Sequence, residues 1–323
     1  MRRAVALTVL IVLAMALLLN VALRWEPCTF LSSRKEFVYL YPVIPNSEDM
    51  GGFAWHLHHV QCLLHLCEVV RLRPVVVFDS GYYFDSGVGP NWWNYFFEAF
   101  PGPSVRREDL TPIRSLPLSG EGPYLYTNAT FQKLLRPMRI DFAAQYKKIR
   151  LNSHMRRRVE EFEREHFGER RMVGVHFRGT DKFPSEYGNE DMRDGKHLTY
   201  EDVLRKLSLH VDDKTKVFCT TDEQPFADAC RRAFPSCVTH DSYRASVSTS
   251  GLKVDKQDKQ TLSFLASQSV HRGAYASPYK KGYDAVMDIW LLSKCELFLR
   301  SNAGNFGSQP ARINPSLVVK ELF

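Results

Sequence analysis

The sequence predicts an α/β protein in which two Rossmann-like domains face each other across a cleft, preceded by one N-terminal transmembrane helix. Short runs rich in β-branched and aromatic residues alternate with longer helical patterns, which is typical of parallel sheets covered by helices. The alternation starts at residue 36 and begins again at residue 169, after a long helical stretch. An uncharged apolar stretch precedes both halves.

The N-terminal segment predicts a signal anchor. Residues 4–23 carry no charged side chain, and about 20 apolar residues span a bilayer as one helix. Because Arg2 and Arg3 precede this stretch, we expect residues 1–3 to be a cytosolic tail and the bulk of the chain to lie in the lumen, as in a type II Golgi membrane protein. A cleavable signal peptide is the alternative, and it leads to the same pathway. Residues 24–35 are expected to form a short stem.

The first expected domain covers residues 36–168. A strand over 36–44, a helix over 53–71 opened by a glycine pair, and a buried-type strand over 74–78 form one β-α-β unit. The rest of this half is expected to contain a helix over 92–100, a strand over 122–126 and a helix over 142–166.

The second expected domain covers residues 169–323 and repeats the pattern. Its polar stretch over 244–272, rich in Ser, Lys, Asp and Gln, is expected to be a loop. The expected strands cover 172–177, 216–221, 236–240, 296–300 and 317–319, and the expected helices cover 199–209, 224–234 and 282–294. In folds of this kind, ligands bind at the carboxyl ends of the strands.

The composition is that of an ordinary globular protein with a basic balance. Of 323 residues, 44% are hydrophobic and 24% are charged, and the net charge is +7. A positive balance favours anionic partners such as a phosphate-bearing substrate, a membrane surface or nucleic acid. The densest basic run, 156–158, is followed at once by several glutamates, which indicates a solvated helix face. We therefore expect no nucleic-acid partner.

Two features bear on covalent modification. There are seven cysteines, and in an oxidising lumen some are expected to form disulfide bonds, while the odd number leaves at least one unpaired. No CxxC pair is present, so no structural zinc site is expected. The sequon that begins at Asn128 predicts a glycoprotein.

The first candidate site follows the strand over 172–177. Alternation along the strand places His176 and Arg178 on one face at its carboxyl end. Arg178 can donate in a bidentate way to a phosphate there, Gly179 allows close approach of a ligand, and Asp181 can orient Arg178 or cap the loop. A strand end with ordinary surface charges is the alternative.

The second candidate site is the turn after Arg300. Its residues 301–308 include Ser301, Ala303, Gly304 and Asn305, and a helix is expected to follow. Such a glycine-bearing turn presents backbone N–H groups to an anion. Its spacing matches neither a P-loop nor a dinucleotide fingerprint.

The third candidate segment starts the first long helix and contains Gly52, Trp55, His56, His58 and His59. The three histidines lack the i, i+4 spacing of a zinc helix, so we expect them to line the cleft rather than to bind metal. The chain also lacks a G-x-S-x-G elbow and a D-x-D triplet. These absences favour a transferase that neutralises its leaving diphosphate with cations and backbone amides, without a metal or other cofactor.

Four blocks together resemble the α1,6-fucosyltransferase family within the GT-B fucosyltransferase superfamily. The segment from His176 to Lys182 resembles that family's H-x-R-R-T-D-K motif, and the segment from Gly52 to Val60 is similar to its G-x-G-C-Q-L-H-H-V stretch. Residues 220–223 resemble its A-T-D-D, and residues 288–293 its D-I-x-x-L-S helix. The blocks follow the family's order and span most of residues 50–308.

The resemblance implies a GT-B fold and an inverting transfer of L-fucose from GDP-β-L-fucose to a hydroxyl of a glycan or glycoconjugate, without a required metal. It implies that Arg178 binds the β-phosphate, that Asp288 contacts the guanine, and that Glu186, four residues after Lys182, is the general base. The full set implied for catalysis is Arg178, Glu186 and Lys182, and that for donor binding is His176, Arg178, Asp181, Asp222, Asp288, Ser301, Ala303, Gly304 and Asn305.

Two departures from the family's pattern leave alternatives open. Gly179 stands where the family has a second Arg, which Lys182 or Arg300 could replace, and Trp55 with His56 replaces the usual Cys-Gln. The acceptor, the linkage and the oligomeric state therefore stay open. A catalytically silent GDP- or glycan-binding protein and a GT-B transferase of another kind, including one for protein O-fucosylation, are the alternatives.

Overall fold

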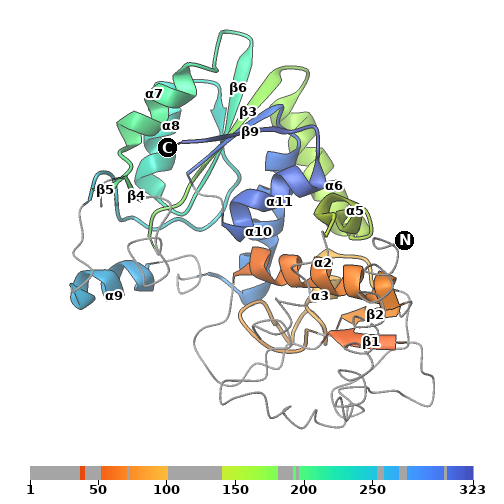
Figure 1. Ribbon diagram of the computed structural model, residues 1–323. Coiled ribbons are helices and arrows are strands. Elements are labelled where there is room, and N and C mark those ends of the chain that lie inside the picture. Colours follow the sequence, from red (N-terminus) through yellow and green to blue (C-terminus); the bar gives the residue numbers. More distant parts are fainter. Residues whose placement is uncertain are drawn as a thin grey trace, which may run out of the picture.

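The computed structural model describes residues 37–40, 52–70, 73–76, 78–100, 140–180, 192–193, 196–252, 258–268, 275–301 and 304–322 (Figure 1). The expected anchor and stem, the strand expected over 122–126 and the sequon at Asn128 lie outside these residues. Within them, no helix combines the length and the apolar character needed to cross a membrane.

The C-terminal half is built on a five-stranded sheet in which every neighbouring pair is parallel. Its strands are β3 (Arg171–Phe177), β6 (Thr215–Thr221), β7 (Cys237–Val238), β8 (Leu297–Arg300) and β9 (Val318–Glu321). The spatial order is β7-β6-β3-β8-β9. In chain order this is 3-2-1-4-5, the order of the Rossmann fold, and the direction of winding reverses between β3 and β8. The strands predicted for this half are confirmed, although β7 is shorter than expected.

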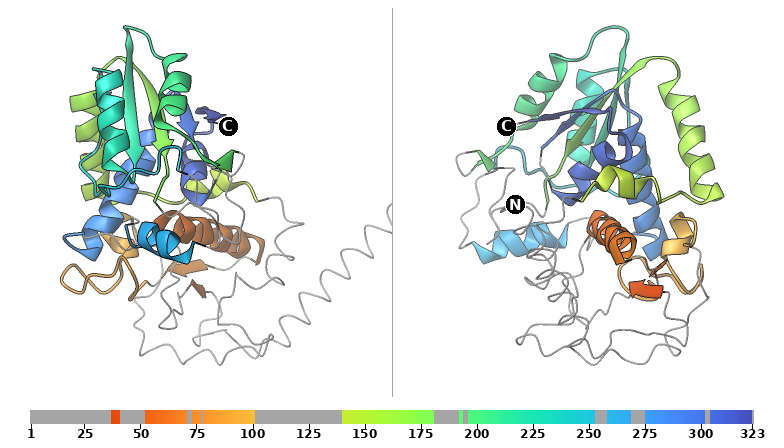
Figure 2. Two further views of the ribbon diagram at one scale, coloured as in Figure 1. Left: turned by 90° about the vertical axis from the view of Figure 1, so that its left-hand side faces the viewer. Right: turned by 45° about the vertical axis from the view of Figure 1, so that its right-hand side comes forward.

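Helices cover both faces of this sheet (Figures 1 and 2). On one face, Val173 and Val175 of β3 pack with residues of α7 (Tyr200–Ser208) and α8 (Gln224–Ala233). On the other face lie α6 (Ser153–Phe162), α10 (Pro278–Ser293) and α11 (Asn305–Ile313). Gly174 permits the close packing of α10, because a Cβ there would lie 2.9 Å from Leu292.

The N-terminal half contains the predicted β-α-β unit. The strand β1 (Phe37–Leu40) pairs in parallel with β2 (Arg73–Val76), and α2 (Phe53–Val70) connects them. The short helix α3 (Trp93–Phe96) follows, and its Phe96 is fully buried against α10, where a Cβ on Gly282 would lie 2.5 Å from the ring. One apolar core therefore runs from α2 through α3 to α10. The division into two domains at residue 168 stays a prediction.

The long helix expected over 142–166 is interrupted. It consists of α5 (Phe142–Tyr146), then α6, then the π-helical turn η2 (Glu163–Phe167). The break arises because Asn152 acts as a second N-cap, with its side chain accepting a hydrogen bond from the backbone N–H of Met155 at 2.9 Å. The helix expected over 92–100 likewise ends early, since Phe97 is extended.

Two further elements were not predicted. The helix α9 (Lys259–Ser267) lies within the stretch expected to be a loop, and Asp258 starts it by accepting a hydrogen bond from the N–H of Thr261 at 3.0 Å. A small antiparallel pair, β4 (Met192–Arg193) and β5 (Lys196–His197), follows residues 181–191. The expectation of a continuous loop over 244–272 is therefore wrong for residues 259–267.

Candidate functional site

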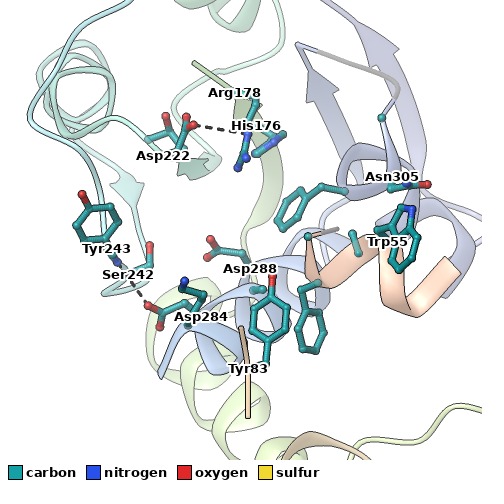
Figure 3. A pocket seen from close by; sticks show the side chains of 18 of the residues that line it. Trp55, Tyr83, His176, Arg178, Asp222, Ser242, Tyr243, Asp284, Asp288 and Asn305 are labelled. Atoms are coloured by element: carbon teal, nitrogen blue, oxygen red, sulfur yellow. Dashed lines mark hydrogen bonds and ion pairs between the residues drawn. The ribbon is translucent and has the colours of Figure 1, made fainter. Parts of the chain in front are cut away.

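A pocket of about 330 Å³ lies where the carboxyl ends of β3 and β6 and the turn after β8 meet the start of α2 and one side of α10 (Figure 3). This position is the crevice at which the winding direction of the sheet reverses, where doubly wound folds bind their ligands. The volume is that of a small-molecule site. The pocket thus joins segments far apart in the sequence.

His176 and Arg178 both face this pocket, as predicted for the end of β3 (Figure 3). The imidazole of His176 is held on two sides, by a 3.0 Å hydrogen bond between its Nδ1 and Oγ1 of Thr220 and by stacking on Phe306. The backbone N–H of Arg178 donates to Oγ of Ser301 at 3.0 Å, and the N–H of Ser301 donates to the carbonyl of His176. These bonds fix the end of β3 against the turn that follows β8.

The Asp222 carboxylate holds the loop of residues 178–180 (the Arg178 loop) in place. Its carboxylate accepts hydrogen bonds from the backbone N–H groups of Gly179 and Thr180, at 2.8 and 3.2 Å, and from the Thr180 hydroxyl at 2.7 Å. Nε of Arg178 lies 3.6 Å from the same carboxylate. The Asp222 side chain is 1% exposed and that of Arg178 is 12% exposed. Asp222 therefore orients Arg178, whose guanidinium lines the pocket.

Packing leaves no room for a side chain at position 179, where the motif that the segment resembles has a second arginine. A Cβ on Gly179 would lie 1.9 Å from Oε1 of Glu223 and 2.8 Å from Oγ1 of Thr249. Glu223 is fully buried and accepts hydrogen bonds from the hydroxyl of Tyr200 and from the N–H of Thr249. Burial and the neighbouring Asp222 raise the pKa of Glu223 to about 7. The space that a side chain at position 179 would need is thus occupied by a buried carboxyl group.

Arg300 does not replace that arginine. Its guanidinium binds Glu321 on β9, with Nη2 and Oε1 2.6 Å apart, and it donates to the carbonyl of Gly307 at 2.9 Å. It is not among the described residues that line the pocket. The suggestion from the sequence that Arg300 could substitute is therefore corrected. Lys182, together with Asp181 and Glu186, lies outside the described residues.

Two helix N-termini meet at the pocket. Gly304 is the N-cap of α11, and Gly304 and Asn305 line the cavity. At the start of α2, Gly52 and Trp55 line it as well. Helix N-termini present unpaired backbone N–H groups and a positive partial charge, and neither α2 nor α11 has an acidic residue in its first turn. Ala303 lies outside the described residues.

His56, His58 and His59 of α2 pack against neighbouring side chains. His56 and His59 are buried, and Nδ1 of His59 lies 2.7 Å from the carbonyl of Trp55. Burial lowers the pKa of His58 to about 4 and that of His59 to about 3, so both are neutral at pH 7. His58 contacts Arg312 of α11. None of the three lines the pocket, contrary to the expectation from the sequence.

The far end of the pocket carries two carboxyl groups from α10 (Figure 3). Asp284 is bound by Nζ of Lys280 at 2.6 Å and by the N–H of Tyr243 at 3.4 Å. Oδ1 of Asp288 is buried without a hydrogen-bond partner among the described residues, and Nδ1 of His240 lies 3.7 Å away. Burial raises the pKa of Asp284 to about 6 and that of Asp288 to about 8.

Asp288 therefore lines the pocket, and its buried Oδ1 lacks a hydrogen-bond donor among the described residues. A ligand that presents N–H groups there would satisfy it and favour its ionised form. Asp284 was missed in the sequence, although its i, i+4 spacing from Asp288 places both on one helix face. Tyr243, Tyr275 and Lys281, which also line this end, carry no local signal that would have identified them.

The described residues contain no group of three or more His, Cys, Asp or Glu side chains arranged to hold a metal ion. The expectation of metal-independent chemistry stays a prediction.

No known protein family matches the sequence, and no curated protein matches it. Among solved structures, the chain is similar to NodZ alpha-1,6-fucosyltransferase co-crystallised with GDP, at 17% identity over 84% of this chain and 91% of that chain, with a TM-score of 0.45. It is also similar to fucosyltransferase NodZ from Bradyrhizobium (16% identity, 82% and 90% coverage, TM-score 0.43). A third likeness is to POFUT1 in complex with GDP (11% identity, 56% and 51% coverage, TM-score 0.35). Because all three TM-scores are below 0.5, a function for this chain has to be inferred from the residues of the pocket.

Proposed function

We propose that this chain is an inverting fucosyltransferase that binds GDP-β-L-fucose in the pocket between β3, β8 and α2. The observation that carries this proposal is the position of Arg178. It lies at the crevice of a Rossmann-type sheet beside the N-termini of α11 and α2, and Asp288 faces the same pocket from α10. An anion site and an unsatisfied acceptor in one pocket suit a nucleoside diphosphate.

The phosphate end is the part that contains Arg178. Its guanidinium can donate two parallel hydrogen bonds to the β-phosphate, while the first backbone N–H groups of α11 and α2 add positive partial charge. Asp222 keeps Arg178 in this orientation through the 3.6 Å ion pair. In the transfer step, the same groups would stabilise the negative charge that develops on the leaving GDP.

The base end is the part that contains Asp288. Guanine carries N1–H and N2–H donors side by side, and a carboxylate accepts both with its two oxygens. Asp288 has a buried oxygen without a donor among the described residues, whereas Asp284 is already bound by Lys280. This supports guanine over bases that do not present two adjacent donors. Fucose as the transferred sugar rests on the family resemblance of the motif blocks.

The acceptor hydroxyl needs a general base. Of the carboxyl groups that the structure describes in the pocket, Asp222 holds the Arg178 loop, Asp284 is paired with Lys280, and Asp288 is assigned to the guanine ring of the nucleotide. We therefore keep Glu186, in the segment 181–191, as the proposed general base, with Lys182 as a further cation near the diphosphate.

We also propose a GT-B arrangement of two domains and a lumenal, Golgi-anchored location.

The experiment is to incubate the purified protein with GDP-fucose and a panel of glycans and to analyse the linkage of any product. Transfer of fucose by the wild type, lost in Glu186→Gln while GDP affinity is kept, is the expected result. GDP binding without transfer to any acceptor would indicate a silent binder instead. Faster turnover with another GDP-sugar would reassign the donor, and a strict requirement for a divalent ion would contradict the metal-free mechanism.

A further inference from the structure

Three cysteines converge on the face of the sheet that α7 and α8 cover. Cys219 lies on β6, Cys230 on α8, and Cys237 at the start of β7. Cys219 and Cys230 are fully buried, and Cys237 is half-buried. Sγ of Cys237 lies 3.5 Å from Sγ of Cys230. All three are free thiols in this structure.

The backbone between Cys230 and Cys237 is held in place by hydrogen bonds. The N–H of Phe234 donates to the carbonyl of Cys230 at 2.9 Å, and the N–H of Cys237 donates to the carbonyl of Phe234 at 2.8 Å. Oγ of Ser236 donates to the carbonyl of Thr215 at 3.0 Å, which ties the turn to β6. A disulfide requires an S–S distance of about 2.05 Å, so side-chain rotation would have to close only about 1.5 Å.

Cys219 is less suited to bond with Cys237. The strand register pairs Cys237 with Val217, so Cys219 is a diagonal neighbour two residues further along β6. Parallel strands are about 4.8 Å apart and rise about 3.3 Å per residue, so the Cα atoms of such diagonal neighbours are about 8 Å apart, whereas a disulfide spans about 4.4–6.8 Å between Cα atoms. The sulfur atoms of Cys230 and Cys237 are therefore the pair that the geometry favours.

We propose that Cys230 and Cys237 form a disulfide bond when the protein meets a small-molecule disulfide oxidant, and that Cys219 stays a thiol. Cys237 is the accessible sulfur, so its thiolate attacks one sulfur of the oxidant, and one thiolate leaves. The thiolate of Cys230 then attacks the Cys237 sulfur of this mixed disulfide, and the second thiolate leaves. The protein loses two electrons and two protons, and the oxidant becomes two thiols.

The electrostatic surroundings favour Cys237, and not Cys230, as the first thiolate, because the pKa of Cys230 is raised. Hydrogen bonds from Cys219 and then Cys230, with help from the charges of Arg231 and Arg244, lower the pKa of Cys237 below that of an ordinary thiol. Burial raises the pKa of Cys295 instead, so Cys295 is an inert thiol and serves as an internal reference. The bond would join the last turn of α8 to the edge strand β7.

The test is a disulfide map after equilibration with a mixture of oxidised and reduced glutathione. Remaining thiols are blocked with N-ethylmaleimide under denaturing conditions. The protein is then digested with trypsin, which cleaves after Arg231, and with the protease Glu-C, which cleaves after Glu223 and so separates Cys219 from Cys230. The peptides that contain Cys230 and Cys237 should stay linked until reduction, while Cys219 and Cys295 carry the label. Full labelling of Cys230 and Cys237, or a bond that includes Cys219, would overturn the proposal.

A stability measurement gives a second test that does not depend on mapping. Cys237→Ala should lower the melting temperature by about 5 °C relative to wild type in the glutathione mixture, because the wild type alone gains the closed loop. With excess dithiothreitol, the two proteins should differ much less. An equal difference with and without dithiothreitol would show that position 237 contributes only packing, and the disulfide would be rejected.

Discussion

The Asp222 carboxylate holds Arg178 in an orientation suited to binding a ligand. Asp222 is almost completely buried and accepts three hydrogen bonds from the Gly179–Thr180 segment in addition to the Arg178 contact. The Asp222 carboxylate thus contacts Nε of Arg178 and leaves the other donors of the guanidinium for a ligand. The guanidinium is therefore oriented before a ligand arrives, so less side-chain entropy is lost on binding.

Asp288 leads to a prediction about proton uptake and release. With a pKa raised to about 8, it is mostly protonated at pH 7 in the unliganded protein. Two N–H donors from guanine would stabilise the carboxylate, so GDP binding at pH 7 should release about one proton through this residue. Calorimetric titrations in buffers of different ionisation enthalpy measure this number.

Asp288→Asn isolates the contribution of that residue. On binding GDP, the variant should no longer release the proton that comes from Asp288. It should also bind GDP at least tenfold more weakly, because an amide presents only one acceptor to the two donors. Asp228→Asn is the matched control, since Asp228 is 44% exposed and pairs with Arg231. Equal proton release by wild type and Asp288→Asn would exclude Asp288 as the base-binding group.

The reason why position 179 has no side chain cannot be read from the sequence. The presence of Gly179 in the motif is visible in the sequence, and so is the absence of a second arginine. The reason is not visible, because the atoms that exclude a side chain belong to Glu223 and Thr249, which are 44 and 70 positions further along the chain. Only the fold brings Glu223 of the β6 end under the loop that follows β3.

At the scale of elements, the start of α11 is expected to act as an anion site. Asn305 is the first residue of this helix and lines the pocket. Asn305→Asp would add a negative charge at a helix N-terminus, which stabilises a helix by about 0.3–1 kcal/mol. The same charge would repel a diphosphate, so GDP affinity should fall about tenfold while the melting temperature stays equal or rises.

Guanosine, which lacks phosphates, provides the control for that prediction. Its affinity should be the same for wild type and Asn305→Asp, because the new charge lies at the phosphate end. If GDP affinity were unchanged, or if guanosine and GDP weakened equally, the phosphates would not lie against α11.

The elements themselves were predictable to different degrees for physical reasons. The strands β3, β6 and β8 are short apolar runs, and the buried core requires such runs, so their positions follow from the sequence. The helix α9 was not predicted because its segment is polar and its start depends on the single cap at Asp258. The break between α5 and α6 depends in the same way on Asn152, whose capping role a continuous helical pattern conceals.

At the scale of the whole molecule, the sheet order places the site. The sequence predicts which strands exist, but the order β7-β6-β3-β8-β9 comes from the three-dimensional pairing. That order puts the end of β3 beside the end of β8, and so brings Arg178 to Ser301, 123 residues away in the chain. The burial of His56 could not be inferred from the spacing of the histidines, because it depends on Phe78 and Trp92. The position of His58 depends in the same way on Arg312 of α11.

The buried titratable groups predict how stability depends on pH. Glu223 and Asp288 have raised pKa values in the folded protein, so the folded state keeps protons that the unfolded state releases, and their effect lowers stability as pH rises toward 8. His58, His59 and His240 have lowered pKa values, so their effect lowers stability as pH falls below 6.5. Above about pH 7.5 these histidines are neutral in both states, so only the carboxyl effect remains among these groups.

The contribution of Glu223 to the free energy of unfolding should therefore fall between pH 6.5 and pH 8. Urea unfolding of wild type and Glu223→Gln at a series of pH values measures this contribution as the difference between the two proteins, because the variant has no titrating group at that position. A difference that stays constant, or that grows in favour of the wild type from pH 6.5 to 8, would contradict the burial of this carboxyl group.

The most direct test of the proposed donor site is the dissociation constant of GDP for wild type, Arg178→Ala and Arg178→Lys. We predict that the wild type binds GDP, that Arg178→Ala weakens binding about 100-fold, and that Arg178→Lys, which keeps the charge but loses the fork, lies between them. Arg205→Ala, an exposed arginine on α7, should bind like the wild type. Equal GDP affinity in wild type and a folded Arg178→Ala, or no GDP binding by the wild type, would contradict the assignment of Arg178 to the diphosphate.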